Sequence, residues 1–320
     1  MNIELSIVNK GTIYYPCVKD GITWETERKG APGALKFTVV KTPGLYFEEG
    51  DAVRLVVDGH KVFFGFVFKK KRNKEQHIEV TAYDQLRYLK NKETYVYKEK
   101  TANQVIEMIA KDFRLNVGSL ENTGYVIPSK VEDDKTLFDI VLNAMDETLL
   151  NTKKLFVLYD DFGHLMLKNI ESMQTNILID ANTGENFTYE SSIDDRTYNQ
   201  IKIVYDNEET GKRDVYMTKN SKHINDWGVL QYYEKASTDK GLVEKVNKLL
   251  DLYDRKTRKL KIEKAFGVPS IRAGSSVVVM LDLGDITVHN MMVCEKVKHT
   301  FSNDYHTMDL TVIGNKEFIA

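Results

Sequence analysis

Residues 50–83 constrain the fold most, because they contain three candidate strands joined by two turns. In the first strand Val53, Leu55 and Val57 recur at every second position, the period that predicts a strand with one buried face. The pair Asp58-Gly59 predicts a tight turn, since both of its residues tolerate positive φ. A basic loop and a third strand complete the stretch, which we therefore predict to be an antiparallel β unit.

The apolar residues of the first two strands divide into two sets. The set that can fill a barrel interior is Val53, Leu55, Phe64 and Phe66, and the opposite set is Val56, Phe63 and Val67. A strand that is apolar on both faces must be covered on both. Two covers fit the sequence. One is packing against the next domain of the same chain, and the other is a subunit interface formed by the opposite set.

The C-terminal part of the chain repeats this order of features from Gly274 onward. Gly50-Asp51-x-Val53-x-Leu55 aligns with Gly274-Ser275-x-Val277-x-Val279, and segments 64–67 and 77–81 align with 291–294 and 308–312. The repeated turn and strand positions are Gly50, Asp58, Gly59, Gly65, Gly274 and Gly284. Few residues are identical, so chance similarity between two β meanders is an alternative. The shared order favours a duplicated β module.

Length and composition limit the classes of protein to consider. A chain of 320 residues is too long for one simple core, so two or three domains are expected. The net charge of −2 does not indicate general binding to nucleic acid or membrane. The only cysteines, Cys17 and Cys294, argue against a disulfide scaffold and fit a reducing cytosol. We find neither a signal peptide nor an apolar run of the roughly 20 residues that a spanning helix needs.

The strand and helix patterns divide the chain into three parts. Residues 1–92 read as all-β, and residues 93–188 combine strands with two helices. The first helix begins with a capping box at Thr101, and the second starts at Thr136, with Asp139 placed to cap it. Residues 189–320 return to strands, with one inserted helix at about residues 239–253. We expect a mixed, β-dominated (α+β) chain in which two similar small antiparallel β-barrel modules flank a small α/β domain.

Candidate catalytic groups are explained better by structure than by chemistry. The acidic pairs Asp133-Asp134, Asp160-Asp161 and Asp194-Asp195 could supply glycosidase carboxylates, but each lies near a predicted turn or cap. The segment Gly274-Ser275-Ser276-Val277 is not a nucleophile elbow, and the sequence has no glycine-rich phosphate loop. We therefore predict no catalytic residues, no cofactor and no enzyme activity.

Metal and nucleic-acid binding are also weakly indicated. The metal-ligand candidates His289, Cys294, His299 and His306 match no compact ligand motif, so we predict no metal site. The basic run Lys69–Lys74 lacks the second basic face or free aromatics of a nucleic-acid site. A solvated hairpin tip explains this run best, and docking to an acidic partner surface is the alternative.

Structural motifs run through the chain in a fixed order. They are Gly50-Asp51-x-Val53-x-Leu55-x-x-Asp58-Gly59, Gly65-Phe66-Val67, Val80-Thr81-Ala82-Tyr83-Asp84-Gln85-Leu86 before the helix at Thr101, and Trp227-Gly228-Val229-Leu230-Gln231-Tyr232-Tyr233-Glu234 before the third helix. In this order, and over essentially its whole length, the chain resembles the XkdQ/YqbQ-type baseplate hub proteins of contractile phage tails and phage-tail-like particles such as R-type bacteriocins.

The resemblance implies a homotrimer whose tube-like β modules form a pseudo-hexameric ring between the hexameric tail tube and the trimeric central spike. The implied partners are other copies of the chain, the tail tube protein, the central spike protein and other baseplate components. No membrane is implied, and DNA would only pass through the lumen if the particle is a true phage. The implied location is the bacterial cytoplasm during assembly, and then a prophage-encoded virion or tail-like particle released by lysis.

Two competing functions are a cell-wall hydrolase at the tail tip and a receptor- or carbohydrate-binding tail module. Some members of the family carry appended lytic domains, and we expect none here because the sequence ends directly after the second module. A duplicated module in a threefold assembly gives six similar positions, which is what a ring facing both sixfold and threefold partners needs. The sequence therefore favours the structural hub.

Overall fold

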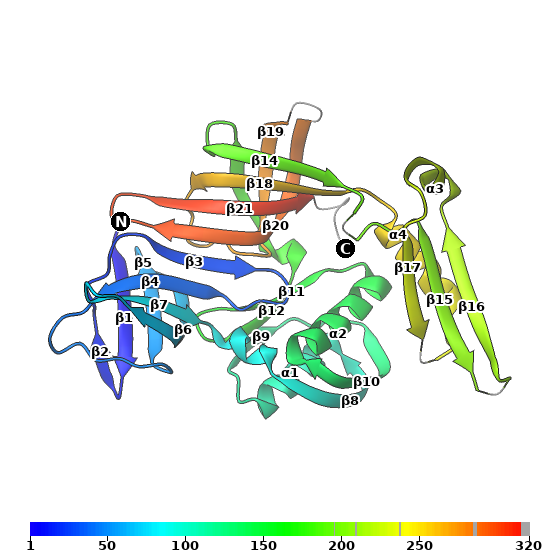
Figure 1. Cartoon of the computed structure of the whole chain (residues 1–320), viewed down its shortest axis with the longest axis horizontal. Helices are drawn as coiled ribbons and strands as arrows, with labels where there is room; N and C mark the ends of the chain where they lie inside the picture. The colour runs from blue at the N-terminus through cyan, green and yellow to red at the C-terminus, as the bar shows by residue number, and fades with distance from the viewer. Residues whose placement is uncertain (195, 209, 237, 284–286, 315–320) are drawn as a thin grey trace. The chain divides into compact units, whose positions relative to one another are not determined.

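The computed structural model describes residues 1–194, 196–208, 210–236, 238–283 and 287–314. Strands dominate the chain, as predicted (Figure 1). The chain divides into two compact units, a larger one of residues 1–188 and 261–312 and a smaller one built from residues 189–260. Each unit contains at least one sheet of its own.

The first β module is an antiparallel sheet with the strand order β3-β4-β7-β6-β5-β1-β2. Its strands are β1 (Ile3–Asn9), β2 (Thr12–Tyr14), β3 (Ile22–Glu27), β4 (Ala34–Val40), β5 (Ala52–Val57), β6 (His60–Arg72) and β7 (His77–Tyr83). Val53, Leu55 and Val57 are fully buried, as the alternation predicts. Alternate residues from six of these strands form one hydrophobic core.

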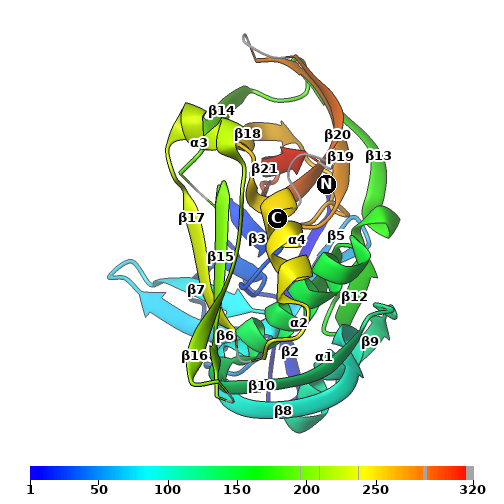
Figure 2. The same cartoon turned by 90° about the vertical axis from the view of Figure 1, so that its right-hand side faces the viewer.

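A middle region with helices follows the first β module. Its elements are η1 (Gln85–Lys90), β8 (Lys92–Thr101), α1 (Ala102–Asp112), β9 (Val117–Leu120), β10 (Val126–Thr136), α2 (Leu137–Thr152), β11 (Phe156–Asp160) and β12 (Leu165–Asn169). β8 and β10 form a long antiparallel ribbon that curves along α1 and α2 (Figure 2). β11, β12 and β9 form a small sheet, and the helices, the ribbon and this sheet share one core.

Both helices of the middle region begin at the predicted residues. The backbone N–H of Thr101 donates to Gln104 Oε1 at 3.0 Å, the second half of a capping box. The hydroxyl of Thr136 accepts from the backbone N–H of Asp139 at 3.1 Å. Each contact satisfies a backbone donor that the first helical turn would leave unpaired.

The second β module has the strand order β14-β18-β21-β20-β19-β13. After η2 (Ile170–Met173), its strands are β13 (Gln174–Asp180), β14 (Asn186–Ser192), β18 (Thr257–Phe266), β19 (Ser276–Asp282), β20 (Thr287–Phe301) and β21 (His306–Gly314). Strands β14 and β18 lead into and out of the smaller unit. That unit contains β15 (Gln200–Asn207), β16 (Lys212–Lys219), α3 (Ser221–Trp227), β17 (Gln231–Ala236) and α4 (Leu242–Tyr253), with α4 at the predicted place of the inserted helix.

The two β modules have corresponding strand orders. The order β3-β4-β7-β6-β5-β1 matches β14-β18-β21-β20-β19-β13, strand for strand. The modules differ at the last strand, because β1 is antiparallel to β5 whereas β13 is parallel to β19. Pairing of β3 with β20 joins both modules into one 13-stranded sheet (Figure 1). No sheet closes on itself within the described ranges, so the barrel form of the modules stays a prediction.

The alignment of the third strands was wrong by one residue. Ile78, Val80 and Ala82 are the buried residues of β7, and their counterparts in β21 are Met308, Leu310 and Val312. The sequence alignment had matched 77–81 with 308–312, which places inward residues opposite outward ones. A slip of one residue reverses every side chain of a strand, and turn residues alone do not prevent that error.

None of the helices in the described part of the chain is both long and apolar enough to cross a membrane.

Candidate functional site

The duplicated stretch has the same backbone geometry in both modules. Gly50 and Gly274 take φ values of +93° and +94°, a conformation that favours glycine. The N–H of Gly50 donates to the carbonyl of Val67, and the N–H of Gly274 donates to that of Cys294, both at 2.8 Å. In return, Val67 and Cys294 donate to the carbonyl of the residue after each glycine, at 2.9 and 2.8 Å. Val67 and Cys294 are therefore equivalent positions, and we call this arrangement the glycine hinge.

Three further repeat positions have individual geometries. Asp58 and Gly59 take φ values of +49° and +80°, as the predicted tight turn requires. Gly284, the expected counterpart of that turn, lies outside the described residues. Gly65 has no room for a side chain, because a Cβ there would meet the ring of Phe63 and the carbonyl of Tyr83.

The inward face of β6 is the opposite of the one predicted. Val53 and Leu55 are register partners of Gly65 and Phe63, so Phe63 lies on the core side. Phe63 and Val67 are 3% and 1% exposed. Two of the three predicted interface residues are thus buried in the subunit's own core, and only Val56 is half-buried. A β-bulge after Leu55 shifts the pairing of β5 with β6, and the alternation of apolar residues gave no sign of it.

The outward face of β6 packs against the middle region of the same chain. The Phe64 ring lies 5.9 Å from that of Phe162, and Phe66 and Phe68 lie 6.4 and 6.0 Å from Tyr88 of η1. The sequence left two possible covers for this strand, the next domain of the same chain and a second subunit. The ring contacts described here are with the next domain of the same chain.

The basic run after this face extends along β6, where Lys70 Nζ lies 3.4 Å from Glu49 and 5.0 Å from the centre of the Phe47 ring. Lys69, Lys71 and Arg72 are exposed. Lys70 donates to the Phe47 carbonyl at 2.7 Å, and Lys71 lies 3.8 Å from Glu79. These residues are part of the strand itself rather than of a loop tip.

The acidic pairs serve turns and caps where the structure describes them. Asp133 accepts from the hydroxyl of Thr94 at 2.8 Å, and Asp134 lies 3.1 Å from Lys92 beside a β-bulge. Asp160 accepts from the backbone N–H of Gly163 in the β11–β12 turn at 2.7 Å. Asp195, the second residue of the last pair, lies outside the described residues. None of these contacts forms an acid–base pair for hydrolysis.

Among the metal-ligand candidates, His299 and His306 form a pair, whereas His289 is exposed on β20. His299 Nδ1 lies 2.8 Å from His306 Nε2, and His299 Nε2 donates to the Ile271 carbonyl at 2.8 Å. Burial lowers the pKa of His299 to about 3 and that of His306 to about 4. Burial also raises the pKa of Cys294 to about 12. A search of the described residues finds no metal-binding group of three or more such side chains.

A buried polar cluster, which the sequence did not reveal, ties the modules to the middle region. Asp84 accepts from the backbone N–H of Gly33 at 2.8 Å, and Gln85 donates to Asp160 at 2.8 Å. Burial, followed by the charge of Asp160, raises the pKa of Asp84 well above its usual value, and burial raises that of Asp160 to about 6. The guanidinium of Arg272 lies 4.4 Å from the centre of the Tyr159 ring. Its positive charge partly offsets the rise in the pKa of both carboxyl groups. No local sequence pattern marks this cluster, because its residues lie far apart in the chain.

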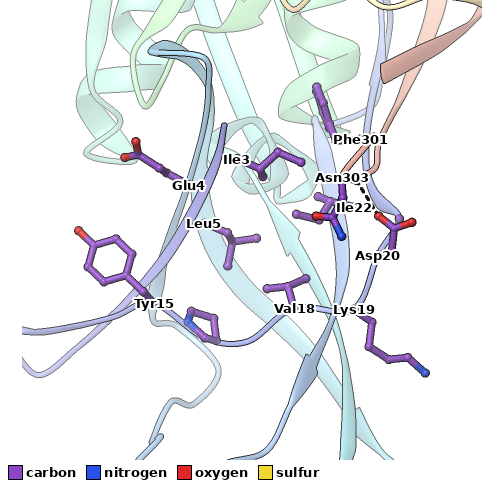
Figure 3. A pocket seen from close by; sticks show the side chains of 12 residues that line it. Ile3, Glu4, Leu5, Tyr15, Val18, Lys19, Asp20, Ile22, Phe301 and Asn303 are labelled. Carbon is purple, nitrogen blue, oxygen red and sulfur yellow. Dashed lines mark hydrogen bonds between the residues drawn. The ribbon is translucent and has the colours of Figure 1, made fainter. Parts of the chain in front are cut away.

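A shallow pocket of about 260 Å³ lies beside the starts of β1 and β3 (Figure 3). Its polar side chains do not converge, since Glu4 and Lys19 point away from each other. Asp20 accepts from the backbone N–H of Asn303 at 3.0 Å and so fixes a loop. The pocket has no arrangement of groups suited to catalysis.

Comparison of the sequence with known proteins gives a family match over most of the chain. The model of the YQBQ-like family matches residues 22–313. Two curated proteins of Bacillus subtilis, the uncharacterized protein YqbQ and the phage-like element PBSX protein XkdQ, are each 30% identical to the chain. Both alignments cover 97% of this chain, and 96% and 97% of the respective relatives.

Solved structures of other proteins share the fold of this chain. The 43 kDa tail protein of prophage MuSo2 from Shewanella oneidensis has a TM-score of 0.73 at 12% identity, with 97% of this chain and 98% of that one covered. An Escherichia coli component of the type VI secretion system, described as similar to phage T4 tail proteins gp27 and gp5, has a TM-score of 0.59 at 12% identity. That alignment covers 99% of this chain and 78% of the other.

Proposed function

The chain belongs to the YQBQ-like family of phage tail proteins, and on that premise we propose that it is the structural baseplate hub of a contractile tail or tail-like particle. In this proposal three copies form a ring, and their six β modules, each in barrel form, occupy similar positions around the lumen. One face of the ring meets the hexameric tail tube, and the other meets the trimeric central spike and further baseplate components.

The duplicated module is the observation that carries the proposal. Two copies of one strand order, each with its own glycine hinge, lie side by side in one continuous sheet. A threefold assembly of such chains has two related interfaces that alternate around the ring, so it presents both approximate sixfold and true threefold symmetry. A protein that joins a sixfold tube to a threefold spike needs this property.

The predicted domain limits form part of the proposal. Residues 1–92 provide the first tube-like module, and residues 93–188 and 189–320 provide the middle domain and the second module, except that residues 174–188, with β13 and the start of β14, belong to the second module. The protein acts through its surfaces and has no catalytic role. It assembles in the bacterial cytoplasm and leaves the cell in a virion or in a headless particle such as an R-type bacteriocin, after lysis.

Light scattering of the full-length chain tests the assembly state. We expect three copies of the 36.8 kDa chain per particle, either alone or in complex with its tail tube or spike protein, whose mass then adds to theirs. A chain that stays monomeric alone and with each partner contradicts the trimeric hub. In a separate assay, clearing of peptidoglycan that is lost on replacing Asp133 and Asp134 by Asn would favour a hydrolase instead.

A further inference from the structure

The joint between the two modules within one chain is an antiparallel strand pair. β3 pairs with the second half of β20, where Glu25 is the register partner of Lys298, and Glu27 that of Lys296. Lys296 Nζ lies 2.9 Å from carboxylate oxygens of both glutamates. Phe301 of this half of β20 is 1% exposed. We call this pairing the internal joint.

The strand that corresponds to β3 in the second module is β14, and its sequence is similar to that of β3. Thr23-Trp24-Glu25-Thr26 corresponds to Thr188-Tyr189-Glu190-Ser191. β14 lies at the end of the sheet, with β18 as its neighbour on one side and no strand on the other among the described residues. Phe187 is 40% exposed there, whereas its counterpart Ile22 is 5% exposed. β14 thus resembles the strand of the internal joint, but within the described ranges it has no strand partner on that side.

The stretch that corresponds to the second half of β20 in the first module is the basic end of β6. The glycine hinge makes Val67 equivalent to Cys294, so Lys69 and Lys71 are equivalent to Lys296 and Lys298. Pairing of β6 with β5 ends at Phe66, and the hinge bonds to Val67 follow. Beyond the hinge, that side of β6 has no strand partner within the described ranges.

We propose that β14 of one copy pairs with residues 69–72 of β6 in the next copy and so repeats the internal joint between chains. Glu190 then lies opposite Lys71 and within reach of Lys69, as Glu25 lies opposite Lys298 and within reach of Lys296. The contact is head-to-tail, because the two edges belong to different modules, and such contacts close into rings when the rotation permits. This inference rests on the proposed ring and assigns its subunit interface to two named edges.

The same observations argue against a purely protective role for the basic edge. Lysines on an edge strand discourage unwanted pairing with other sheets. Protection does not explain why β14 repeats the joint sequence or why Phe187 is exposed. Both features are expected if a second copy covers β14 and if its lysines match Glu190.

Disulfide trapping tests the predicted register directly. In a Cys17→Ser background, which removes the exposed thiol, the variant Glu190→Cys with Lys71→Cys should give covalent dimers and trimers on non-reducing gels after oxidation. Each single variant should stay uncrosslinked, and a mixture of the two single variants should give dimers only. The matched control, Glu25→Cys with Lys298→Cys, should form its disulfide inside one chain and give no larger species.

Charge exchange provides a second, independent readout. Glu190→Lys should raise the concentration at the midpoint of trimer formation by about tenfold, and adding Lys69→Glu with Lys71→Glu should restore it. Glu107→Lys, at an exposed position of α1, should have no effect.

Light scattering of the same samples separates the two claims. A trimer that neither crosslinks nor responds to charge exchange overturns the edge pairing and leaves the trimeric hub intact. A monomer at every concentration, alone and with the tail tube or spike protein, contradicts the hub itself.

Discussion

The two β modules share one strand order. They differ in what covers the strand segment that follows the glycine hinge, which is the second half of β20 in one module and residues 69–72 of β6 in the other. In the second module this half of β20 carries Val297, His299 and Phe301, all buried beneath or beside β3. In the first module the corresponding residues 69–72 are three lysines and an arginine at an open edge. The two modules therefore share a strand order, but their residues differ where β3 of the same chain covers one edge and no described strand covers the other.

The modules also differ at the hairpin that precedes the hinge. β3 and β4 are joined by a short turn, residues 28–33, whereas β14 and β18 are joined through the smaller unit. The ends of that insertion meet, since the hydroxyl of Thr257 donates to the carbonyl of Ser192 at 3.2 Å. A hairpin tip tolerates such an insertion because its backbone is not needed for the core.

The largest effect is expected from Phe63→Asp. This change places an unpaired charge in the core of the first module, and we expect it to cost about 5 kcal/mol and to unfold the module. Val56→Asp, at the half-buried member of the same predicted set, should leave the chain folded. Circular dichroism during urea unfolding measures both. A folded Phe63→Asp variant would show that the second face of the hairpin is free after all.

The second prediction compares the loss of stability caused by substitutions at equivalent positions in the two modules. Gly65→Val should cost about 3 kcal/mol because a Cβ there meets the Tyr83 carbonyl. Met292 occupies the equivalent position of β20 and already has a side chain, so Met292→Val should cost about 1 kcal/mol. Thermal unfolding of the two variants gives the ranking, and equal losses would contradict the close contact at Gly65.

The third effect is a pH dependence that comes from the buried histidine of the second module. Burial lowers the pKa of His299 to about 3, so below about pH 6.5 the unfolded chain binds a proton that the folded chain does not. Stability should therefore fall as the pH falls, by about 2 kcal/mol from this group at pH 5. The raised pKa of Asp160, about 6, acts in the opposite direction between about pH 4 and 6, since there the folded chain binds the extra proton, and the raised pKa of Asp84 acts in the same direction as that of Asp160.

A variant isolates the histidine contribution. His299→Phe should lower stability at pH 7, because the Ile271 carbonyl loses its donor, but should flatten the decline towards pH 5. His289→Asn, at an exposed position, should leave the profile unchanged. An unaltered slope in His299→Phe would remove this residue from the account.

The smallest effect is expected from shortening the second module. Replacing residues 193–256 by a short turn with the sequence of residues 28–33 should leave the larger unit folded, with its unfolding transition changed by about 1 kcal/mol or less. Differential scanning calorimetry should show one transition fewer than the full chain. Loss of the remaining transition would mean that the second module depends on the insertion.

Local sequence patterns predicted the elements but not the faces of every strand. Three predictions that depend on residues close in sequence are confirmed. They are the alternation at Val53, Leu55 and Val57, the helix starts at Thr101 and Thr136, and the inserted helix. The prediction of the inward face of β6 was wrong because β-bulges shift the strand pairing by one residue. No residue type in the sequence marks these bulges.

The joint between modules could have been found in the sequence. The repeat of Thr23-Trp24-Glu25-Thr26 at residues 188–191 is a clear signal, but it lies outside the stretch that first revealed the duplication. The cluster of Asp84, Asp160 and Arg272 could not be predicted, since only the tertiary fold brings these distant residues together. Long-range polar contacts of this kind have no local pattern.

Electron microscopy of the assembled chain, viewed along its axis, tests the central claim most directly. The account predicts a ring of six similar lobes with true threefold symmetry, in which each chain supplies two neighbouring lobes. A ring with another number of lobes, or one in which the two modules of a chain do not occupy neighbouring positions, would contradict it.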